Sequence, residues 1–576
     1  MKAGEILISG IFNGSRLLEV PFYQRAYVWQ EEQWERLLED LKYVTKIRQQ
    51  YFMGSIILKS GRTLNTWEKY SECRVVIDGQ QRLTTLLIFM KALCLKKNEN
   101  DLFERDFILE DGSIALRHGQ NDVEAFKKVV EAKTASPIDN IKPKSQIIDA
   151  FNYFCENIEP DLYDRSTIRK NLQFVCIDLA EDEDEQHVFD TINSLGVRLT
   201  TAELLKNYFF NQNNVDEYKQ KWLDVFEKDD EAKTYWDTEI EAGRIRRSMI
   251  DLFFDSYFQI FVQDNRYSVL TEDKLMYDRV DRLAKSYQHF INKYCNGDKN
   301  VILSSLKEYA ECFRDSFDPS CCERSIPATY GIDRLNVLIF GLKNTTMIPY
   351  VLYLAKNVTN QNEFNQICRV LESYIMRRIV VHATTKNYNR LYTSLILNQI
   401  CDAKSLLDRL SNVNDSTIFV PTDTDLENGF KNTKLYNLQA KGILYFIESG
   451  IRPANSATAL LGFDGYSLEH LLPKKWRNNW PTCENDEAAR ERDSKLLTIG
   501  NLAIITQSLN ASIRDSEWET KKEGKKNKPG LILCAAGLNT LKEALTKTDW
   551  NEAEIDARAH WLYEKAAKLW KIYDIF

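Results

Sequence analysis

The sequence predicts an α+β protein that is mainly helical, and three observations lead to this fold class. Strand and helix signals alternate over the first ninety residues, which is typical of a small α/β unit. From about residue 205 to 410 the apolar spacing is helical and strand signals are few. The last segment again combines strand and helix signals. We therefore expect three domains, at residues 1–205, 206–434 and 435–576.

Composition indicates a soluble globular protein. The chain has 576 residues, enough for three or four domains of typical size, with 44% hydrophobic and 28% charged residues. No apolar run reaches the length of a membrane span and no signal peptide is visible, so we expect a cytoplasmic protein. The net charge of -8 argues against a protein that coats DNA along its whole surface, but it leaves room for a local basic groove.

The cysteine pattern and several missing motifs narrow the chemistry. The 12 cysteines include no Cys-x-x-Cys pair, and Cys321-Cys322 are adjacent, which suits reduced thiols better than a zinc site or a disulfide ladder. The sequence also lacks a Walker A loop, a Gly-x-Ser-x-Gly elbow and a His-Glu-x-x-His motif. The functional signal must therefore come from other residues.

The strongest local signal lies where a predicted strand meets a predicted helix. Val75–Ile77 are apolar and β-branched, and residues 83–90 have helical apolar spacing, while Gly79 lets the backbone turn sharply between them. Backbone amides at a helix N-terminus attract anions, and an arginine adds a fixed positive charge. Two interpretations are open, a phosphate or nucleotide site and an ordinary capped turn with a salt bridge. The polar residues concerned are Asp78, Gln80, Gln81 and Arg82.

Two further segments could contribute to this site. Tyr23, Gln24 and Arg25 lie in an aromatic stretch and could form a second basic lip for an anionic ligand, although the aromatic residues could equally pack under the helix that follows. Asn193 and Arg198 lie at a predicted break between two helices, where Thr200 or Thr201 fits a helix N-cap. We treat these two residues as minor candidates.

The helical middle domain is expected to connect the two ends of the chain and to transmit changes between them. Residues 411–434 are rich in Asn, Asp, Thr and Ser and show no periodicity, so they are the best candidate for a linker.

The second chemical signal lies near the C-terminus. Glu469 precedes His470 close to a proline, and residues 496–505 read as a β-hairpin with Gly500 and Asn501 at its turn. Asn510 follows nine residues later. This order suits a one-metal nuclease, although a single histidine in a pattern like this is more often structural.

Each residue of this set has a chemical role in a nuclease. His470 would deprotonate water. Glu469 and Asn510 would hold a divalent cation through oxygen, which suits Mg²⁺ or Mn²⁺, and the metal would stabilise charge on the scissile phosphate. Lysine runs are most often solvated surface, but those flanking this set are candidate DNA contacts: Lys474, Lys475, Lys521 and Lys522.

These motifs together resemble the GmrSD-type, modification-dependent restriction enzymes in their fused single-chain form. The N-terminal half is similar in Tyr23-Gln-Arg with Trp29, Gly54-Ser-Ile, Ile77-Asp-Gly-Gln-Gln-Arg-Leu-Thr-Thr, and Phe189-x-x-Ile-Asn-x-x-Gly-x-x-Leu-Thr. The C-terminal half is similar in Glu469-His-x-x-Pro, Gly500-Asn-Leu, Asn510 and Trp518-x-x-Lys. The middle is matched only through Arg377-Arg378.

The resemblance implies a ParB- and sulfiredoxin-like N-terminal domain that binds and hydrolyses a nucleoside triphosphate, and a ββα-metal (HNH) nuclease domain at the C-terminus. It places Asp78, Gly79, Gln80, Gln81 and Arg82 in the nucleotide site, with Asp78 acting in hydrolysis and Tyr23, Gln24 and Arg25 lining it. It makes His470 the general base, Asn501 the residue that orients the loop, and Glu469 and Asn510 the metal ligands. Glu469 stands where an aspartate is common, and its longer side chain would shift the metal.

We therefore expect a nucleotide-regulated, metal-dependent DNA endonuclease of bacterial defence against phage, acting on double-stranded and often modified DNA. A homodimer would let two nicks cut both strands. The alternative is a nucleotide-gated DNA-binding switch that does not cleave. A purely helical scaffold would leave both polar clusters without a purpose.

Overall fold

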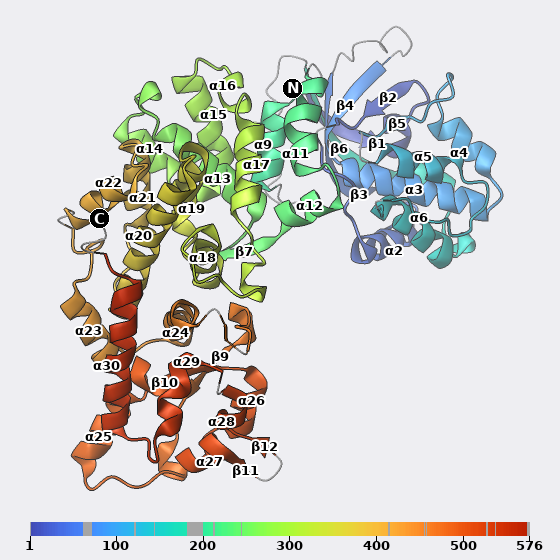
Figure 1. Cartoon of the computed structure of the whole chain (residues 1–576). Helices are drawn as coiled ribbons and strands as arrows, with labels where there is room; N and C mark the ends of the chain where they lie inside the picture. The colour runs from blue at the N-terminus through green and yellow to red at the C-terminus, as the bar shows by residue number, and fades with distance from the viewer. Residues whose placement is uncertain are drawn as a thin grey trace. The chain divides into compact units, whose positions relative to one another are not determined.

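The computed structural model describes the chain except residues 1, 23, 61–71, 120–121, 143, 181–199, 211–213, 244, 413–414, 454, 457, 526–527, 536 and 573–576. The chain folds into two compact units, Met1–Asp230 and Glu231–Phe576 (Figure 1). The second unit contains both the helical segment and the C-terminal segment, which the sequence analysis divided at residue 435. The fold is mainly helical with a small mixed sheet, as the α+β prediction requires.

The first unit is built around a six-stranded mixed sheet. Its strand order is β1-β6-β3-β4-β2-β5, so the strand next to the Asp78 junction, β4, lies inside the sheet. β1 pairs antiparallel with β6, and β3 pairs antiparallel with β4, while the other neighbours are parallel. The strands are β1 (Lys2–Leu7), β2 (Arg16–Glu19), β3 (Tyr51–Ser60), β4 (Glu72–Asp78), β5 (Leu116–Arg117) and β6 (Leu172–Leu179).

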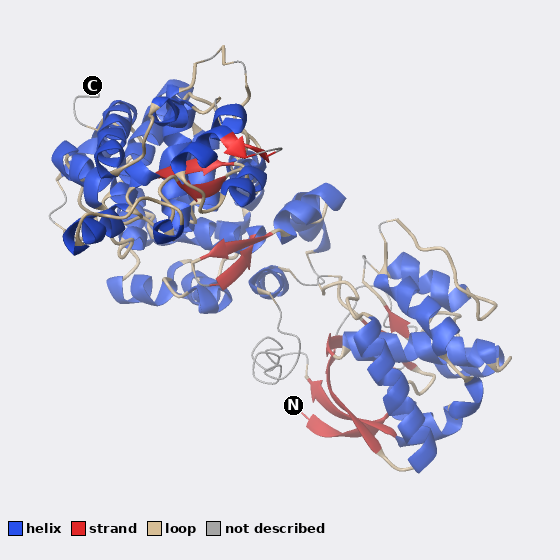
Figure 2. Ribbon diagram, turned by 90° about the horizontal axis from the view of Figure 1, so that it is seen from below, coloured by secondary structure: helices blue, strands red, loops and turns tan. Residues whose placement is uncertain are grey.

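Helices cover one face of this sheet, as both ribbon views show (Figures 1 and 2). Side chains alternate along a strand, so Ile56 and Leu58 of β3 enter the main core with the helices, whereas Ile57 belongs to a smaller cluster. α3 (Gln80–Lys96) is buried over nearly its whole length and packs against α6 (Gln146–Asn157). The helix that carries the Asp-Gly-Gln-Gln-Arg string is therefore the central helix of the unit.

Shorter helices complete the first unit. Thr200 is the N-cap of α9 through a capping box with Glu203, in agreement with the sequence. The remaining helices are α1 (Ile8–Ile11), α2 (Glu31–Ile47), α4 (Asn100–Phe107), α5 (Val123–Glu131), α7 (Arg165–Asn171), α9 (Thr201–Phe209), α10 (Val215–Tyr218) and α11 (Asp224–Phe226).

The second unit begins with helices and one short hairpin. The hairpin of β7 (Glu239–Ala242) and β8 (Ile245–Ser248) is antiparallel and was not expected from the sequence. The longer helices are α12 (Asp230–Asp237), α13 (Met249–Val262), α14 (Thr271–Tyr277), α15 (Leu283–Tyr294), α17 (Leu306–Ser316), α19 (Ile348–Asn357), α20 (Gln361–Val380), α21 (Tyr388–Leu397), α22 (Ala403–Ser411) and α24 (Asn437–Ile451).

The expected linker at 411–434 is wrong in part, because α23 (Asp423–Asn432) forms there. Thr422 begins this helix with a capping box to Asp425, and Leu426 and Phe430 bury one face of it. Arg377 and Arg378 of α20 are both 1% exposed, and their guanidinium groups donate to backbone carbonyls of residues 417–421. Residues 417–432 therefore pack against the unit with one face buried, and they do not form an unstructured linker.

The C-terminal part of this unit holds two strands that pair antiparallel, β9 (Ser467–His470) and β10 (Leu502–Ile505). The predicted hairpin over 496–505 is wrong: β10 pairs with β9, and Gly500 and Asn501 form a 3-10 turn that enters β10. In the sequence, α25 (Asp486–Lys495) lies between these two strands. The helices after β10 are α26 (Gln507–Ile513), α27 (Trp518–Glu523), α28 (Leu531–Ala535), α29 (Asn539–Lys542) and α30 (Glu552–Leu569). A short pair, β11 (Gly524–Lys525) and β12 (Lys528–Pro529), follows α27.

None of the helices in the described parts of the chain has the length and apolar character needed to cross a membrane.

Candidate functional site

The junction of β4 and α3 is a tight turn with little spare room. Gly79 has φ 97°, in the left-handed region, and a Cβ there would lie 2.6 Å from Cγ2 of Ile56. Arg82 donates to Asp78 over 3.1 Å, and the two side chains are 22% and 21% exposed. Gly54 also has a positive φ, and a Cβ there would collide with Nη1 of Arg82. The Gly54-Ser-Ile motif thus leaves space for the arginine of the other motif.

The two glutamines of the string bind neighbouring backbone. Gln80 donates from Nε2 to the Arg25 carbonyl over 3.1 Å. Gln81 accepts from the Val28 amide over 2.9 Å and donates to the Ala26 carbonyl over 3.2 Å. Both side chains are buried. In this structure, therefore, these side chains fix residues 25–28 against α3. In a nucleotide site they would position that segment and would not contact the nucleotide themselves.

The remaining predicted members of this site lie beside the junction or outside the described residues. Gln24 donates to the Ile77 carbonyl over 3.2 Å and so ties its segment to the end of β4, and Arg25 is half-buried. Tyr23, Asn193 and Arg198 lie outside the described residues. The structure therefore brings Gln24, Arg25 and the Asp78–Arg82 string together.

A buried polar network behind the junction was missed by the sequence analysis. The Tyr27 hydroxyl lies 2.7 Å from Thr85 Oγ1 and accepts from Trp34, and the Tyr27 amide donates to Asp122. The Thr84 hydroxyl is hydrogen-bonded to Nε2 of His118 over 3.2 Å. The other ring nitrogen, Nδ1, lies 3.9 Å from Asp122. Burial lowers the pKa of His118 to about 3 and raises the pKa of Asp122 to about 6. The members come from segments far apart in the sequence, so no local pattern indicates them.

In the second unit, His470 ends β9 opposite Leu502 of β10. Its Nε2 is shielded from solvent and has no hydrogen-bond partner among the described residues. Burial, followed by the positive charges of Lys474 and Lys521, lowers the pKa of His470 to about 4. The imidazole is therefore neutral at pH 7, the form that can accept a proton.

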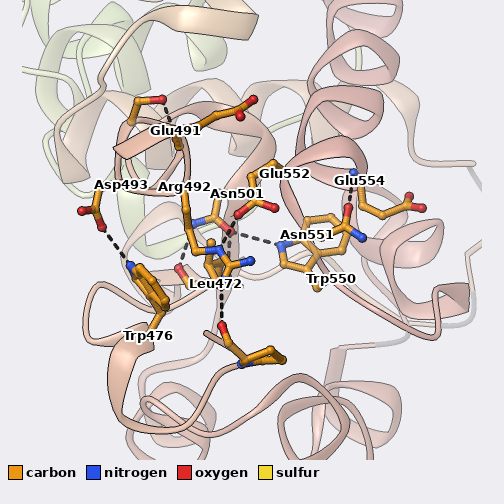
Figure 3. A network of polar contacts seen from close by, with 12 residues as sticks. Leu472, Trp476, Glu491, Arg492, Asp493, Asn501, Trp550, Asn551, Glu552 and Glu554 are labelled. Atoms are coloured by element: carbon orange, nitrogen blue, oxygen red, sulfur yellow. Dashed lines mark hydrogen bonds and ion pairs between the residues drawn. The ribbon is translucent and has the colours of Figure 1, made fainter. Parts of the chain in front are cut away.

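Asn501 fixes the loop that leaves His470. It is fully buried; its side chain accepts from the Leu472 amide over 2.7 Å and donates to the Leu472 and Leu496 carbonyls. Trp550 also donates to its oxygen over 3.1 Å, and Figure 3 shows the amide between Leu472 and Trp550. These contacts are compatible with the orienting role that the resemblance implies for Asn501.

α30 covers the turn that contains Asn501. A Cβ at Gly500 would collide with the Ile555 carbonyl of α30, which explains why glycine precedes the asparagine. Arg558 of the same helix donates from Nη1 to the Gly500 and Leu502 carbonyls over 2.6 and 2.8 Å. Arg492 of α25 pairs with Glu552 at the start of α30 (Figure 3). Arg558 and Trp550 are positioning residues that the sequence analysis missed.

Glu469 and Lys521 form a buried ion pair. Lys521 contacts Glu469 Oε1 and also donates to the His470 carbonyl over 2.7 Å, and their side chains are 0% and 7% exposed, respectively. Burial raises the pKa of Glu469, against the effect of Lys521. This placement corrects the expectation that Lys521 is a surface contact for DNA: its ammonium group is buried and neutralises Glu469.

Asn510 lies on α26 against β9. Its Nδ2 donates to Ser467 Oγ over 3.1 Å and to the Leu468 carbonyl over 2.9 Å. The candidate lysines differ in exposure: Lys474 and Lys475 are exposed, whereas Lys522 is half-buried and donates to the Lys547 carbonyl.

The residues expected to hold a divalent cation do not fit one as they are arranged. Glu469 and Asn510 have the oxygen donors that Mg²⁺ and Mn²⁺ prefer, but the ammonium group of Lys521 already binds the Glu469 carboxylate. Within the part of the chain that the structure describes, no group of three or more His, Cys, Asp or Glu side chains is placed to hold a metal ion. A cation at Glu469 would have to replace Lys521.

Comparison with protein families matches both ends of the chain. Residues 8–210 match the family described as "GmrSD restriction endonuclease, N-terminal domain", and residues 420–565 match "GmrSD restriction endonucleases, C-terminal domain". No curated protein matches the chain.

The two matches cover more than half of the chain, in the order of the fused single-chain form, and they contain the Asp78 junction and the β9–β10 site respectively. A protein with both domains is a restriction nuclease whose substrate is DNA. The chain belongs to the GmrSD restriction endonucleases.

Proposed function

We propose that DNA is cleaved at the β9–β10 site and that His470 is the general base. One observation carries this proposal: His470 Nε2 is a proton acceptor without a partner in the described structure, and the loop that follows it is held by Asn501, on a turn that α30 covers. A base must be unprotonated to take a proton from water, and burial keeps His470 neutral in this shielded conformation. Opening of the site to solvent would remove the main cause of the lowered pKa and so make His470 a stronger base.

We further propose that cleavage depends on Mg²⁺ or Mn²⁺, with Glu469 and Asn510 as ligands, although these residues are not arranged for a cation here. In this conformation Nε2 of His470 is shielded and Lys521 holds Glu469. A site closed in both respects supports a nuclease that opens only in response to a signal. DNA would approach over the exposed Lys474 and Lys475, with the half-buried Lys522 as a further candidate contact.

The signal in this proposal is a nucleoside triphosphate at the β4–α3 junction. The N-terminus of α3, Arg82 and the half-buried Arg25 offer amides and positive charge to a phosphate, and Asp78 would act in hydrolysis. Phage DNA with modified bases is the proposed substrate, and a homodimer would cut both strands.

Plasmid and phage DNA cleavage tests the catalytic assignment. We expect His470→Ala to reduce the cleavage rate by about 10²–10⁴-fold, the usual contribution of a general base. Nucleotide turnover should persist, because the Asp78 junction belongs to the other unit. His560→Ala is the matched control, since His560 lies on α30 with half of its side chain exposed. Retained cleavage in His470→Ala would reject the assignment.

A second experiment tests nucleotide control. Asp78→Ala should abolish hydrolysis and change how cleavage responds to nucleotide, whereas Asp101→Ala, an exposed carboxylate on α4, should change neither. The readouts are phosphate release and cleavage with and without each nucleoside triphosphate. Identical cleavage by the wild type and Asp78→Ala under every nucleotide condition would contradict coupling.

The alternative is a nucleotide-gated switch that binds DNA without cutting it. The buried Glu469–Lys521 pair favours this alternative to the extent that Lys521 keeps a cation away from Glu469. Nucleotide-dependent DNA retention with no nicks, in Mg²⁺ and in Mn²⁺, would establish it.

A further inference from the structure

The helical part of the second unit contains a cavity that neither motif uses. Its volume is about 190 Å³. It lies between the β7–β8 hairpin, α13, the residues after α14, the turn before α19 and the start of α21. Gly243, Thr346 and Asn389 line it and are exposed, so they mark where the cavity opens to solvent. A small molecule could therefore enter without a rearrangement of the core.

One face of α13 forms a wall of the cavity. Leu252, Asp255, Ser256 and Gln259 recur at helical spacing and all line it. The hydroxyl of Ser256 is already used, because it donates to the Leu252 carbonyl over 2.7 Å. The Asp255 carboxylate is paired with Arg247, so the polar group of this wall that keeps an unused atom is the Gln259 amide.

Two buried polar groups that line the cavity have atoms without a partner. Gln259 is 6% exposed; its Nε2 donates to the Tyr277 carbonyl over 3.4 Å, but its Oε1 accepts nothing from the described residues. Tyr392 is 1% exposed, and no described residue bonds to its hydroxyl. An unsatisfied buried polar atom costs free energy. Both atoms are shielded from water in this structure, so a ligand donor in the cavity would satisfy them after a small adjustment of these side chains.

The charges of the cavity favour a cation. Asp255 and Asp278 both line it, and Arg247 pairs with Asp255 over 2.9 Å while donating to the Asp251 carbonyl. Desolvation and the charge of Asp255 raise the pKa of Asp278, with Arg390 acting in the opposite direction. The described lining thus has two carboxylates, Asp255 and Asp278, and one guanidinium, Arg247, which is already paired with Asp255. Its net charge is negative.

Besides threonine and asparagine side chains, the lining has an apolar part formed by Ile245, Leu252, Val280 and Pro349. A metal ion gains nothing from such walls, whereas a methylene chain does. We propose that this cavity binds a short aliphatic amine of the polyamine type, with its N–H donors at Asp278, Gln259 and Tyr392 and its methylenes against the apolar wall. This binding site is separate from the nuclease function proposed above and does not depend on it.

Isothermal titration of the full chain with putrescine tests the proposal. We expect one site with a dissociation constant of roughly 1 mM or tighter. The diol 1,4-butanediol has the same chain length without charge, and it should bind at least about tenfold more weakly, because hydrogen bonds to charged groups are the stronger ones. Equal binding of the diol and the diamine, or no binding of putrescine to the folded wild type, would overturn the proposal.

Two variants locate the site. Asp278→Asn should weaken putrescine binding by about tenfold or more, and Tyr392→Phe by about three- to tenfold. Tyr392→Phe removes only a hydroxyl without a partner in the described structure, so it should fold even if Asp278→Asn does not; thermal unfolding followed by circular dichroism checks this. Asp315→Asn, an exposed carboxylate on α17, is the control and should bind as the wild type does. Unchanged affinity in both cavity variants would overturn the location.

Discussion

The two motif regions use the same kinds of side chain in different surroundings. At the β4–α3 junction, Asp78 and Arg82 pair where each is about one-fifth exposed. At the β9–β10 site, Glu469 and Lys521 pair where both are buried. In both regions amide side chains, those of Gln81 and Asn501, bind backbone of a neighbouring segment.

This difference shows which charges remain available to a ligand. A partly exposed ion pair can exchange its partner for a phosphate at small cost, because water already screens it. A buried pair cannot lose one member without leaving an uncompensated charge in the interior. Arg82 can therefore leave Asp78 for a phosphate at little cost. Lys521 can leave Glu469 only if another cation takes its place.

The largest effect should come from breaking the buried pair. Lys521→Met leaves Glu469 unpaired in the interior and should lower the free energy of unfolding by about 3–5 kcal/mol. Thermal unfolding and hydrogen exchange of β9 measure it. Lys522→Met is the matched control, since Lys522 is half-buried, donates to the Lys547 carbonyl and lies 4.0 Å from the carboxylate of Glu523, a residue that stays largely exposed. Adding Glu469→Gln to Lys521→Met should recover most of the loss. Equal stability of the two single variants would remove the contrast between the regions.

An intermediate effect should appear as pH dependence in the first unit. Between about pH 6 and 4 the unfolded chain protonates His118 while the folded protein does not, so this residue makes stability fall as pH falls. Asp122 has a raised pKa in the folded state and acts in the opposite direction, making stability rise as pH falls through about 6. The two contributions largely cancel in the wild type.

His118→Asn removes one of these contributions. The variant should gain stability as pH falls from about 6 to 4, with a slope of up to about 1.4 kcal/mol per pH unit. Urea unfolding at a series of pH values, followed by hydrogen exchange in α3 and α5, provides the measurement. A variant whose stability follows the same pH curve as the wild type would show that His118 and Asp122 do not titrate as an opposed pair.

The smallest effect is expected at the partly exposed pair. Arg82→Gln should change the free energy of unfolding by about 0–1 kcal/mol, the range for exposed ion pairs, while weakening phosphate binding at the junction. Thermal unfolding and nucleotide titration separate the two effects. A loss of stability as large as that of Lys521→Met would show that the junction is as tightly closed as the second site.

Local signals in the sequence predicted local structure. The strand, glycine turn and helix around Asp78 are contiguous, so apolar spacing was enough to place them. The hairpin predicted at 496–505 was wrong because the partner of β10 is β9, more than thirty residues upstream. The spacing of apolar residues does not indicate which strands pair over such a separation. The linker predicted at 411–434 was wrong over 423–432, where a polar composition hid the capping box of Thr422 that begins α23.

The site could be predicted less completely than the fold. Motif resemblance proposed His470, Asn501 and Lys521 as site residues. It did not indicate that Lys521 is buried against Glu469, since this contact joins two elements about fifty residues apart. Arg558 and Trp550 carried no signal at all, because an arginine that donates to backbone carbonyls has no partner side chain to suggest it. The buried Tyr27–His118 network was missed because its members come from segments far apart in the sequence.

The packing of α30 on the Gly500–Asn501 turn also makes the β9–β10 region depend on residues that follow it in the chain. The turn that leads into β10 is held by Trp550 and Arg558, which come after both strands in the sequence. Because a chain is synthesised from its N-terminus, β9 and β10 leave the ribosome before the helix that fixes this turn. The arrangement beside His470 is therefore complete only after α30 has been made, and a chain truncated before α30 would lack the contacts that hold it.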